Sequence, residues 1–189
     1  MKPGSWKLPQ PDWTAIDALA AGRSIVADSR QVRPGDIFLA FRGEYADGRK
    51  YIADAIAAGA AGVIWEAEDF VWDAAWPVPN HAVPTLRAQA GIVAAHLLGD
   101  PSQAMWVAGI TGTNGKTSIS HWLAQAFTLL GGKGGVLGTV GNGFPEALES
   151  STHTTLDPVN LQNWFARLRD AGASHVALEV SSHGLDQAR

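Results

Sequence analysis

The clearest pattern in the sequence is a short apolar run followed by a glycine loop and then by apolar residues at helical spacing. The run covers residues 105–110 and is short enough for a buried strand. The loop, residues 111–117, reads Thr-Gly-Thr-Asn-Gly-Lys-Thr. The pattern after Thr117 predicts a helix that ends at Gly131 and Gly132. The apolar positions that define this helix are Ile119, Leu123, Ala126, Phe127 and Leu130.

Strand-like and helix-like segments also alternate in the first half of the chain, which predicts a small α/β unit. The predicted strands are residues 24–27, 37–41 and 62–65, and the predicted helices are residues 14–22, 50–58 and 86–98. Three prolines interrupt residues 69–84, where no clear pattern is present. We place a domain boundary between about residues 85 and 104, with the domains drawn at 1–88 and 89–189.

After the glycine loop the same alternation continues. Residues 136–140 predict a strand, and Asp157 with Pro158 predicts a capped helix start. That helix presents one apolar face and ends at Gly172. Residues 175–180 form an apolar run interrupted by one acid, Glu179, and predict another strand.

The glycine loop is typical of nucleotide triphosphate binding. Glycines let the backbone approach closely, and the amides and the helix N-terminus face the phosphates. Lys116 would neutralise the outer phosphate charge, and the Thr117 hydroxyl could ligate magnesium. The usual first glycine of a P-loop should fall at Ile110, so the match is incomplete. The candidate nucleotide-binding residues are Gly112, Thr113, Asn114, Gly115, Lys116 and Thr117.

Glu179 is the most informative residue outside the loop. An acid at the carboxyl end of a buried parallel strand is placed to help hold magnesium beside the nucleotide. We therefore pair Glu179 with Thr117 as metal ligands, and name Lys116 and Glu179 as the catalytic candidates. An acid in a surface salt bridge is the alternative.

Other polar groups carry weaker signals. Ser182 and His183 do not predict a serine hydrolase, because neighbours on an extended chain point to opposite faces. The hydroxyls of Thr154, Thr155 and Ser181 suit contacts to substrate or phosphate, and helix capping is an equally good use of the threonines. The polar segment of residues 42–49 is longer than a tight turn needs, so it is a candidate binding loop.

Composition limits the class of protein. The 189 residues are 46% hydrophobic and 17% charged, which is typical of a folded globular chain. A formal net charge of −4 shows no excess of basic residues, which a nucleic-acid-binding surface would need. No apolar stretch reaches membrane-spanning length, the N-terminus lacks a signal-peptide core, and there is no cysteine. We expect a cytoplasmic protein.

Taken together, residues 111–117 and the sequence Glu-Val-Ser-Ser-His-Gly at 179–184 closely resemble the Mur ligase family of cell-wall synthesis. The phosphate loop of that family departs from the usual pattern in the same way. Further agreement comes from residues 28–30, 34–38, 46–49 and 154–155. The resemblance implies an α/β fold: a small N-terminal α/β substrate-binding domain, then the first part of a P-loop-type parallel-sheet ATPase domain.

The resemblance also implies an activity. The residues 179–184 point to the members that use ATP and Mg²⁺ to add the third amino acid to UDP-N-acetylmuramoyl-L-alanyl-D-glutamate, through an acyl-phosphate intermediate. Meso-diaminopimelate is favoured over L-lysine on overall similarity alone. The positions that match substrate contacts of the family are Ala27, Ser29, Glu44, Tyr45, Ala46, Thr154, Thr155, Ser181, Gln187 and Arg189.

A complete ligase of this kind continues beyond the region that Arg189 matches. We therefore expect an N-terminal fragment that does not ligate by itself, from an enzyme that is monomeric when complete. Two alternatives stay open, namely a P-loop kinase or NTPase acting on a small molecule and a non-catalytic nucleotide-binding module. Only the ligase requires affinity for UDP-N-acetylmuramoyl-L-alanyl-D-glutamate.

Overall fold

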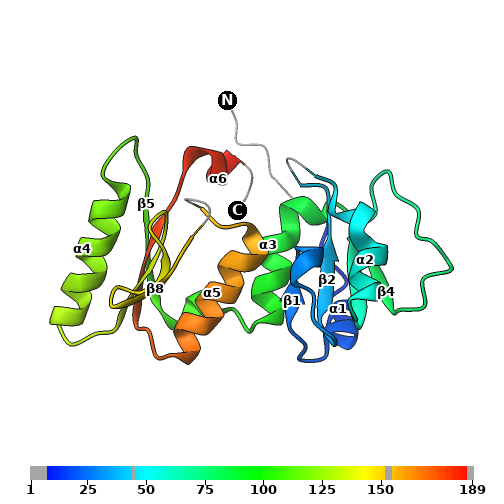
Figure 1. Cartoon of the computed structure of the whole chain (residues 1–189), viewed down its shortest axis with the longest axis horizontal. Coiled ribbons are helices and arrows are strands. Elements are labelled where there is room, and N and C mark those ends of the chain that lie inside the picture. Colours follow the sequence, from blue (N-terminus) through cyan, green and yellow to red (C-terminus); the bar gives the residue numbers. More distant parts are fainter. Residues whose placement is uncertain (1–7, 44–45, 152–154, 187–189) are drawn as a thin grey trace. The chain divides into compact units, whose positions relative to one another are not determined.

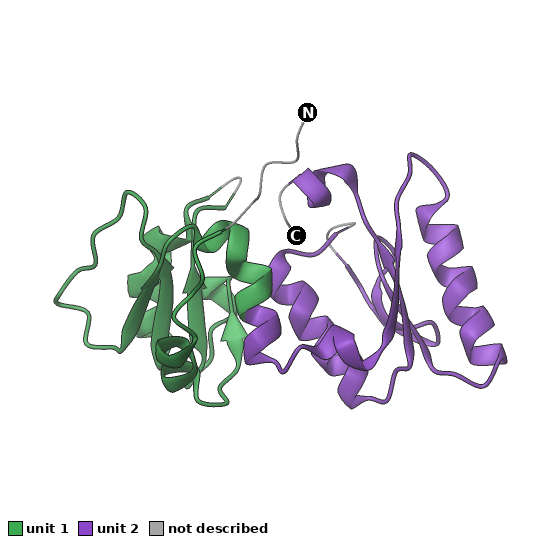
Figure 2. Ribbon diagram, turned by 180° about the vertical axis from the view of Figure 1, so that it is seen from behind, with its two compact units in different colours: residues 1–93 green, residues 94–189 purple. Residues whose placement is uncertain are grey.

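A computed structural model describes residues 8–43, 46–151 and 155–186. The chain divides into two compact units, residues 1–93 and 94–189 (Figure 2). Both units combine helices with parallel strands, so the predicted α/β class is confirmed.

The first unit is built on a four-stranded parallel sheet with the order β1-β2-β3-β4 (Figure 1). Every residue of β2 and β3 is buried, as expected for central strands with both faces covered. Helix α1 packs against β3 and β4, and α2 packs against β2. The strands are β1 (Ile25–Val26), β2 (Ile37–Ala40), β3 (Gly62–Glu66) and β4 (Asn80–Val83). The helices are α1 (Trp13–Ala20), η1 (Ser29–Gln31), η2 (Gly48–Tyr51), α2 (Ile52–Ala57) and α3 (Leu86–Leu97).

Strand β4 was not predicted, because prolines flank a segment of only four residues. It pairs in parallel with β3, and the Trp65 indole N–H donates to the Asn80 side-chain oxygen at 2.9 Å. The division between the units lies within α3, and the domain ranges 1–88 and 89–189 remain a prediction.

The long connection between β3 and β4 is held by aromatic packing. Trp65 stacks with Trp72 at 5.8 Å between ring centroids, and Trp72 meets Trp76 edge-on at 4.8 Å. Phe70 lies edge-on to Trp65 at 5.6 Å. This connection therefore has a packed interior although it has no regular secondary structure.

The second unit contains a five-stranded sheet with the order β5-β9-β6-β7-β8. Strands β5, β9 and β6 are parallel, and β7 and β8 extend the sheet as an antiparallel hairpin. The strands are β5 (Trp106–Ile110), β6 (Gly134–Leu137), β7 (Asn142–Phe144), β8 (Ala147–Glu149) and β9 (His175–Glu179). The helices are η3 (Pro101–Ala104), α4 (Lys116–Leu129), α5 (Pro158–Asp170) and α6 (Ser182–Asp186).

The strand predicted at residues 136–140 is displaced, because β6 begins at the glycines and ends at Leu137. A Cβ at Gly134 would collide with the backbone of Ala124 in α4, with its carbonyl carbon only 2.9 Å away. The glycines thus let the helix approach the strand closely. The hairpin of β7 and β8 was also not predicted.

The helix predicted after the glycine loop is confirmed as α4, which buries Ser120 and Ala124, whereas Ile119 is 43% exposed. One further expectation about the second unit was wrong. Ser182 begins α6, so the extended conformation assumed for Ser182 and His183 is not present. Asp157 does cap α5, since its carboxylate accepts the N–H groups of Val159 and Asn160.

Within the described ranges, none of the helices is both long and apolar enough to span a bilayer.

Candidate functional site

The glycine loop lies between β5 and α4, as the sequence pattern predicted. Gly112 and Gly115 have φ angles of 141° and 81°, in the region that favours glycine. They let the chain turn from the end of the strand into the first turn of the helix. The N-terminus of α4 therefore opens on this loop, which is an arrangement that binds anions.

Lys116 is the first residue of α4. Its ammonium group donates a hydrogen bond to the Gly112 carbonyl at 2.7 Å, so the side chain folds back over the loop. In this conformation the Lys116 charge is held by a neutral carbonyl, and a phosphate oxygen could replace that acceptor. The position suits a lysine that binds phosphate.

Glu179 is the last residue of β9 and is only 1% exposed. The parallel pairing of β5 and β9 places Glu179 beside Ile110, directly before the glycine loop. The Thr117 hydroxyl donates to Glu179 Oε2 at 3.1 Å. The structure thus brings together the two predicted metal ligands, which are 62 positions apart in the sequence. The alternative of a surface salt bridge for Glu179 does not fit its burial.

The donor set fits magnesium. A carboxylate and a hydroxyl are hard oxygen ligands, and Mg²⁺ in nucleotide sites takes one or two protein ligands together with phosphate oxygens and water. Thr117 and Glu179 would supply the protein ligands. When bound there, the ion would neutralise phosphate charge.

Thr139 is a contact of this site that sequence reasoning missed. Its N–H donates to Glu179 Oε1 at 3.1 Å, and its hydroxyl donates to Oε2 at 3.0 Å. Gly138 lies against the same carboxylate, since a Cβ there would be 2.6 Å from Glu179 Cδ. A glycine and a hydroxyl residue directly after a strand were the available signal, and the misplaced end of β6 concealed it.

Thr155 and Ser181 lie next to each other at the end of β9. Thr155 is 4% exposed, and its hydroxyl oxygen accepts the Ser181 N–H at 3.0 Å. The Ser181 hydroxyl oxygen accepts the Gly184 N–H at 3.0 Å, which caps the start of α6. Both hydroxyls are thus used within the fold. Their contacts to substrate remain a prediction.

The candidate substrate residues of the first unit lie at the carboxyl ends of β1 and β2. Ala27 directly follows β1, and Ser29 begins η1. Ala46 belongs to the loop after β2, where its carbonyl accepts the Gly43 N–H at 2.9 Å. Ligands of parallel sheets bind at this edge. The other predicted contacts, Glu44, Tyr45, Thr154, Gln187 and Arg189, lie outside the described residues.

Asp28 caps η1 between Ala27 and Ser29. Its carboxylate accepts the Arg30 N–H at 3.0 Å and forms an ion pair with the Arg30 guanidinium at 2.7 Å. The hydrogen bond from Arg30 holds the pKa of Asp28 below its ordinary value. This charged turn fixes the chain directly after β1.

A buried arginine supports the loop after β2. The Arg49 side chain is 1% exposed and forms an ion pair with Asp47 at 2.7 Å. Its guanidinium also donates to the carbonyls of Glu66, at 3.3 Å, and Glu68. The hydrogen bond from Arg49 lowers the pKa of Asp47. Arg49 therefore ties the predicted binding loop to the end of β3.

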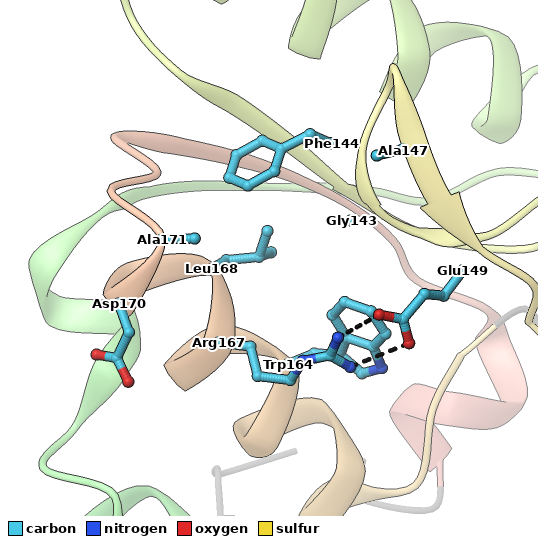
Figure 3. Close-up of a pocket in the computed structure, with 9 residues that line it drawn as sticks. All are labelled: Gly143, Phe144, Ala147, Glu149, Trp164, Arg167, Leu168, Asp170 and Ala171. Atoms are coloured by element: carbon cyan, nitrogen blue, oxygen red, sulfur yellow. Dashed lines mark hydrogen bonds and ion pairs between the residues drawn. The ribbon is translucent and has the colours of Figure 1, made fainter.

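A cavity of about 400 Å³ lies elsewhere in the second unit, between the β7–β8 hairpin and α5 (Figure 3). Arg167 forms an ion pair with Glu149 there and stacks over the Trp164 ring at 3.9 Å. None of the lining residues is a predicted site residue. Because its arginine is paired with its glutamate, we do not treat this cavity as the functional site.

Comparison with known proteins assigns the family. A model described as "Mur ligase family, catalytic domain" matches residues 23–98, and one described as "Mur ligase middle domain" matches residues 110–189. The chain belongs to the Mur ligase family. The first match covers the four-stranded parallel sheet, and the second covers the glycine loop and Glu179.

Among curated relatives, the chain is 60% identical over 183 residues to the UDP-N-acetylmuramoyl-L-alanyl-D-glutamate--2,6-diaminopimelate ligase of Chromobacterium violaceum, covering 95% of this chain and 37% of that protein. It is 55% identical over 173 residues to the ligase of the same name from Neisseria meningitidis serogroup B, covering 91% and 35%. The chain spans about a third of the length of these Mur ligases.

Two solved Mur ligase structures are similar in fold. A UDP-N-acetylmuramoyl-L-alanyl-D-glutamate--2,6-diaminopimelate ligase shares 34% identity with a TM-score of 0.68, covering 87% of this chain and 33% of that one. MurF from Thermotoga maritima in complex with ADP shares 24% identity with a TM-score of 0.55, covering 88% and 33%. The second likeness shows the fold alone.

Proposed function

We propose that this chain forms the UDP-substrate domain and part of the ATP domain of a MurE-type ligase, an enzyme that adds meso-2,6-diaminopimelate to UDP-N-acetylmuramoyl-L-alanyl-D-glutamate. The observation that carries the proposal is the contact between Thr117 and the buried Glu179, directly beside a glycine loop. The names of relatives at 60% and 55% identity support the substrate and favour diaminopimelate over lysine. Because the proposed substrates are nucleotides, we place the activity in the cytoplasm.

The proposed chemistry assigns a role to each of the two units. The carboxyl ends of β1 and β2, with Ala27, Ser29 and Ala46, would hold the UDP end of the substrate. In the second unit, residues 112–117 would bind the phosphates of ATP, and Lys116 would neutralise charge on the phosphoryl group that passes to the glutamate carboxylate. An incoming amine then attacks the resulting acyl phosphate and releases phosphate.

Positioning and charge neutralisation account for most of such a transfer. A lysine, a hydroxyl and a metal-binding acid therefore suffice for the part of the reaction carried by this chain. We predict that residues 1–189 alone do not ligate, and ATP-dependent formation of the tripeptide product by the purified chain would refute that prediction.

Nucleotide binding tests the proposal directly. Titration of the chain with ATP and Mg²⁺ in a calorimeter should show binding, and Lys116→Ala should weaken it by about 10–100-fold, since a charged hydrogen-bond donor to phosphate is lost. Lys133→Ala is the matched control, because the Lys133 ammonium contacts the Ala171 carbonyl and the Phe144 ring instead. Equal loss in both variants would contradict the assigned role of Lys116.

A second titration tests the substrate. The chain should bind UDP-N-acetylmuramoyl-L-alanyl-D-glutamate without ATP, and Lys116→Ala should leave this affinity unchanged. ATP binding without any affinity for the UDP compound would instead favour a P-loop kinase or a non-catalytic nucleotide-binding module.

A further inference from the structure

The carboxylate of Glu179 is held from two sides. Thr117 donates its hydroxyl to Oε2 from the start of α4. Thr139 donates its N–H to Oε1 and its hydroxyl to Oε2 from the turn after β6. The two Thr139 contacts, at 3.1 and 3.0 Å, reach both oxygens of the same carboxylate, so they fix its orientation as well as its location.

The turn that carries Thr139 is itself fixed to the sheet. Asn142, at the start of β7, is 3% exposed, and its side-chain oxygen accepts the Gly138 N–H at 3.1 Å. The same N–H lies 3.2 Å from the Gly141 carbonyl, and Leu137 pairs with Asn142 across the hairpin. The hairpin that the sequence pattern missed thus provides a rigid base for the N–H of Thr139.

Gly138 provides the space that this arrangement needs. A Cβ at this position would overlap with Glu179 Oε1 and would be 2.7 Å from Cγ. Since backbone and carboxylate are this close, the carboxylate fits between Gly138 and Thr117 in a narrow range of orientations. The turn therefore contacts the Glu179 carboxylate directly, through Gly138 and Thr139.

We propose that Thr139 is a positioning residue for Glu179: it holds the carboxylate so that Oε2 faces Thr117, where the magnesium of the bound nucleotide would lie. The inference rests on the proposed function. The Thr139 N–H holds Oε1, and Oε2 has a second lone pair, so it can keep the Thr139 hydroxyl as a donor and still face a cation on the side of Thr117. Residues that orient a metal ligand in this way commonly change metal affinity by about 10–100-fold when substituted.

The test compares ATP affinity in Mg²⁺ with ATP affinity in EDTA, measured by calorimetry on the 189-residue chain. The ratio of the two is the magnesium enhancement. Thr139→Val keeps the branched shape and the N–H but removes the hydroxyl, and should reduce the enhancement by about tenfold. Thr139→Ser should restore it, because the hydroxyl returns. ATP affinity in EDTA should stay unchanged in both variants.

Thr128→Val is the matched control. The Thr128 hydroxyl donates to the Ala124 carbonyl at 2.9 Å within α4, and Glu179 takes its hydroxyl donors from Thr117 and Thr139 instead. A general effect of losing a threonine hydroxyl would appear in both variants, whereas a positioning effect appears only with Thr139→Val. Should Thr139→Val fail to fold, Thr139→Ala provides the same comparison with a smaller side chain.

A double variant tests whether Thr139 acts through Glu179. In a Glu179→Gln background, Thr139→Val should cause no further loss of the enhancement, because Thr139 acts through the carboxylate. Wild-type enhancement in the single Thr139→Val variant, or full additivity in the double variant, would overturn the positioning role alone. A wild-type chain whose ATP affinity is the same in Mg²⁺ and in EDTA would overturn the proposed function and the positioning role together.

Discussion

Glu66 and Glu179 occupy equivalent places in the two units. Each is the last residue of a strand that has parallel neighbours on both sides, and each is buried, at 5% and 1% exposure. Both side chains therefore lie at the edge where parallel sheets bind ligands. By sequence position alone the two acids look alike.

Their hydrogen-bond donors differ. Glu66 accepts two backbone N–H groups, from Arg42 at 3.1 Å and from Arg87 at 2.9 Å. It thereby joins the loop after β2 to the first turn of α3. Glu179 accepts two hydroxyls in addition to one N–H, from Thr117 and Thr139.

The difference shows what kind of donor makes a buried acid available to a ligand. A backbone N–H cannot turn away or become an acceptor, so a carboxylate held only by such groups is a structural link. A hydroxyl can rotate, donate, accept or bind a metal ion. The hydroxyl donors around Glu179 therefore make it the better candidate for a metal ligand of these two buried acids.

The largest loss of stability is expected from a substitution in the first unit, at Arg49, which donates to the Glu66 carbonyl. Arg49→Ala removes a buried partner of Asp47 and should lower the free energy of unfolding by about 3–5 kcal/mol, since breaking a buried ion pair leaves a charge uncompensated. Urea unfolding measures this. Arg42→Ala is the control, because its ion pair with Asp69 spans 3.9 Å between exposed groups and should contribute less than about 1 kcal/mol.

Matched amide substitutions test the comparison itself. Glu66→Gln places an NH₂ against a backbone N–H and should cost about 1–3 kcal/mol of stability, because one donor loses its acceptor. Glu179→Gln should cost less than about 1 kcal/mol, because the hydroxyls of Thr117 and Thr139 can rotate to accept. In ATP titrations the order should reverse, with the magnesium enhancement lost only in Glu179→Gln. Equal stability losses would contradict the distinction.

A substitution at Gly138 tests how tightly the Glu179 carboxylate is packed. Gly138→Ala forces its Cβ against the Glu179 carboxylate and should destabilise the unit by about 1–3 kcal/mol, as overpacking of a buried site does. Gly109→Ala is the matched control in β5, where the nearest atom to an added Cβ is Val180 Cγ2 at 3.4 Å. Thermal unfolding of both variants measures the difference, and a comparable loss at Gly109 would remove the case for a tight fit at Gly138.

The smallest expected effect is a pH dependence in the first unit. The hydrogen bond from Arg49 lowers the pKa of Asp47 below its ordinary value of 3.8. A carboxyl group with a lowered pKa in the folded state stabilises the fold above its unfolded pKa, and this contribution is lost as the pH falls through the lower folded value. Unfolding free energy measured from pH 6 downward should therefore fall less steeply in Asp47→Asn than in the wild type.

Asp28→Asn provides the comparison for that measurement. The Arg30 partner of Asp28 is 87% exposed, whereas the Arg49 partner of Asp47 is 1% exposed. Solvent screens the exposed pair. Asp28→Asn should therefore alter the fall of the unfolding free energy at acid pH less than Asp47→Asn does. A larger change in Asp28→Asn would show that burial of the arginine is not what matters.

Local sequence determined the parts of this protein that depend on neighbouring residues. The glycine loop between a strand and a helix and the capped start of α5 follow from short patterns, because φ preferences and caps act over a few residues. The strand with one acid at its end also followed from its apolar run, and it placed Glu179 at the correct edge.

Tertiary structure alone decided which distant groups meet. Strand β4 and the β7–β8 hairpin are too short to be predicted from periodicity, and they form because neighbouring strands pair with them. The buried residues of α4 are the small Ser120 and Ala124, because Gly134 allows the helix to approach the sheet closely. The contact of Thr139 with Glu179 joins residues 40 positions apart. Such contacts depend on the order and register of strands, which side-chain patterns along the chain do not encode.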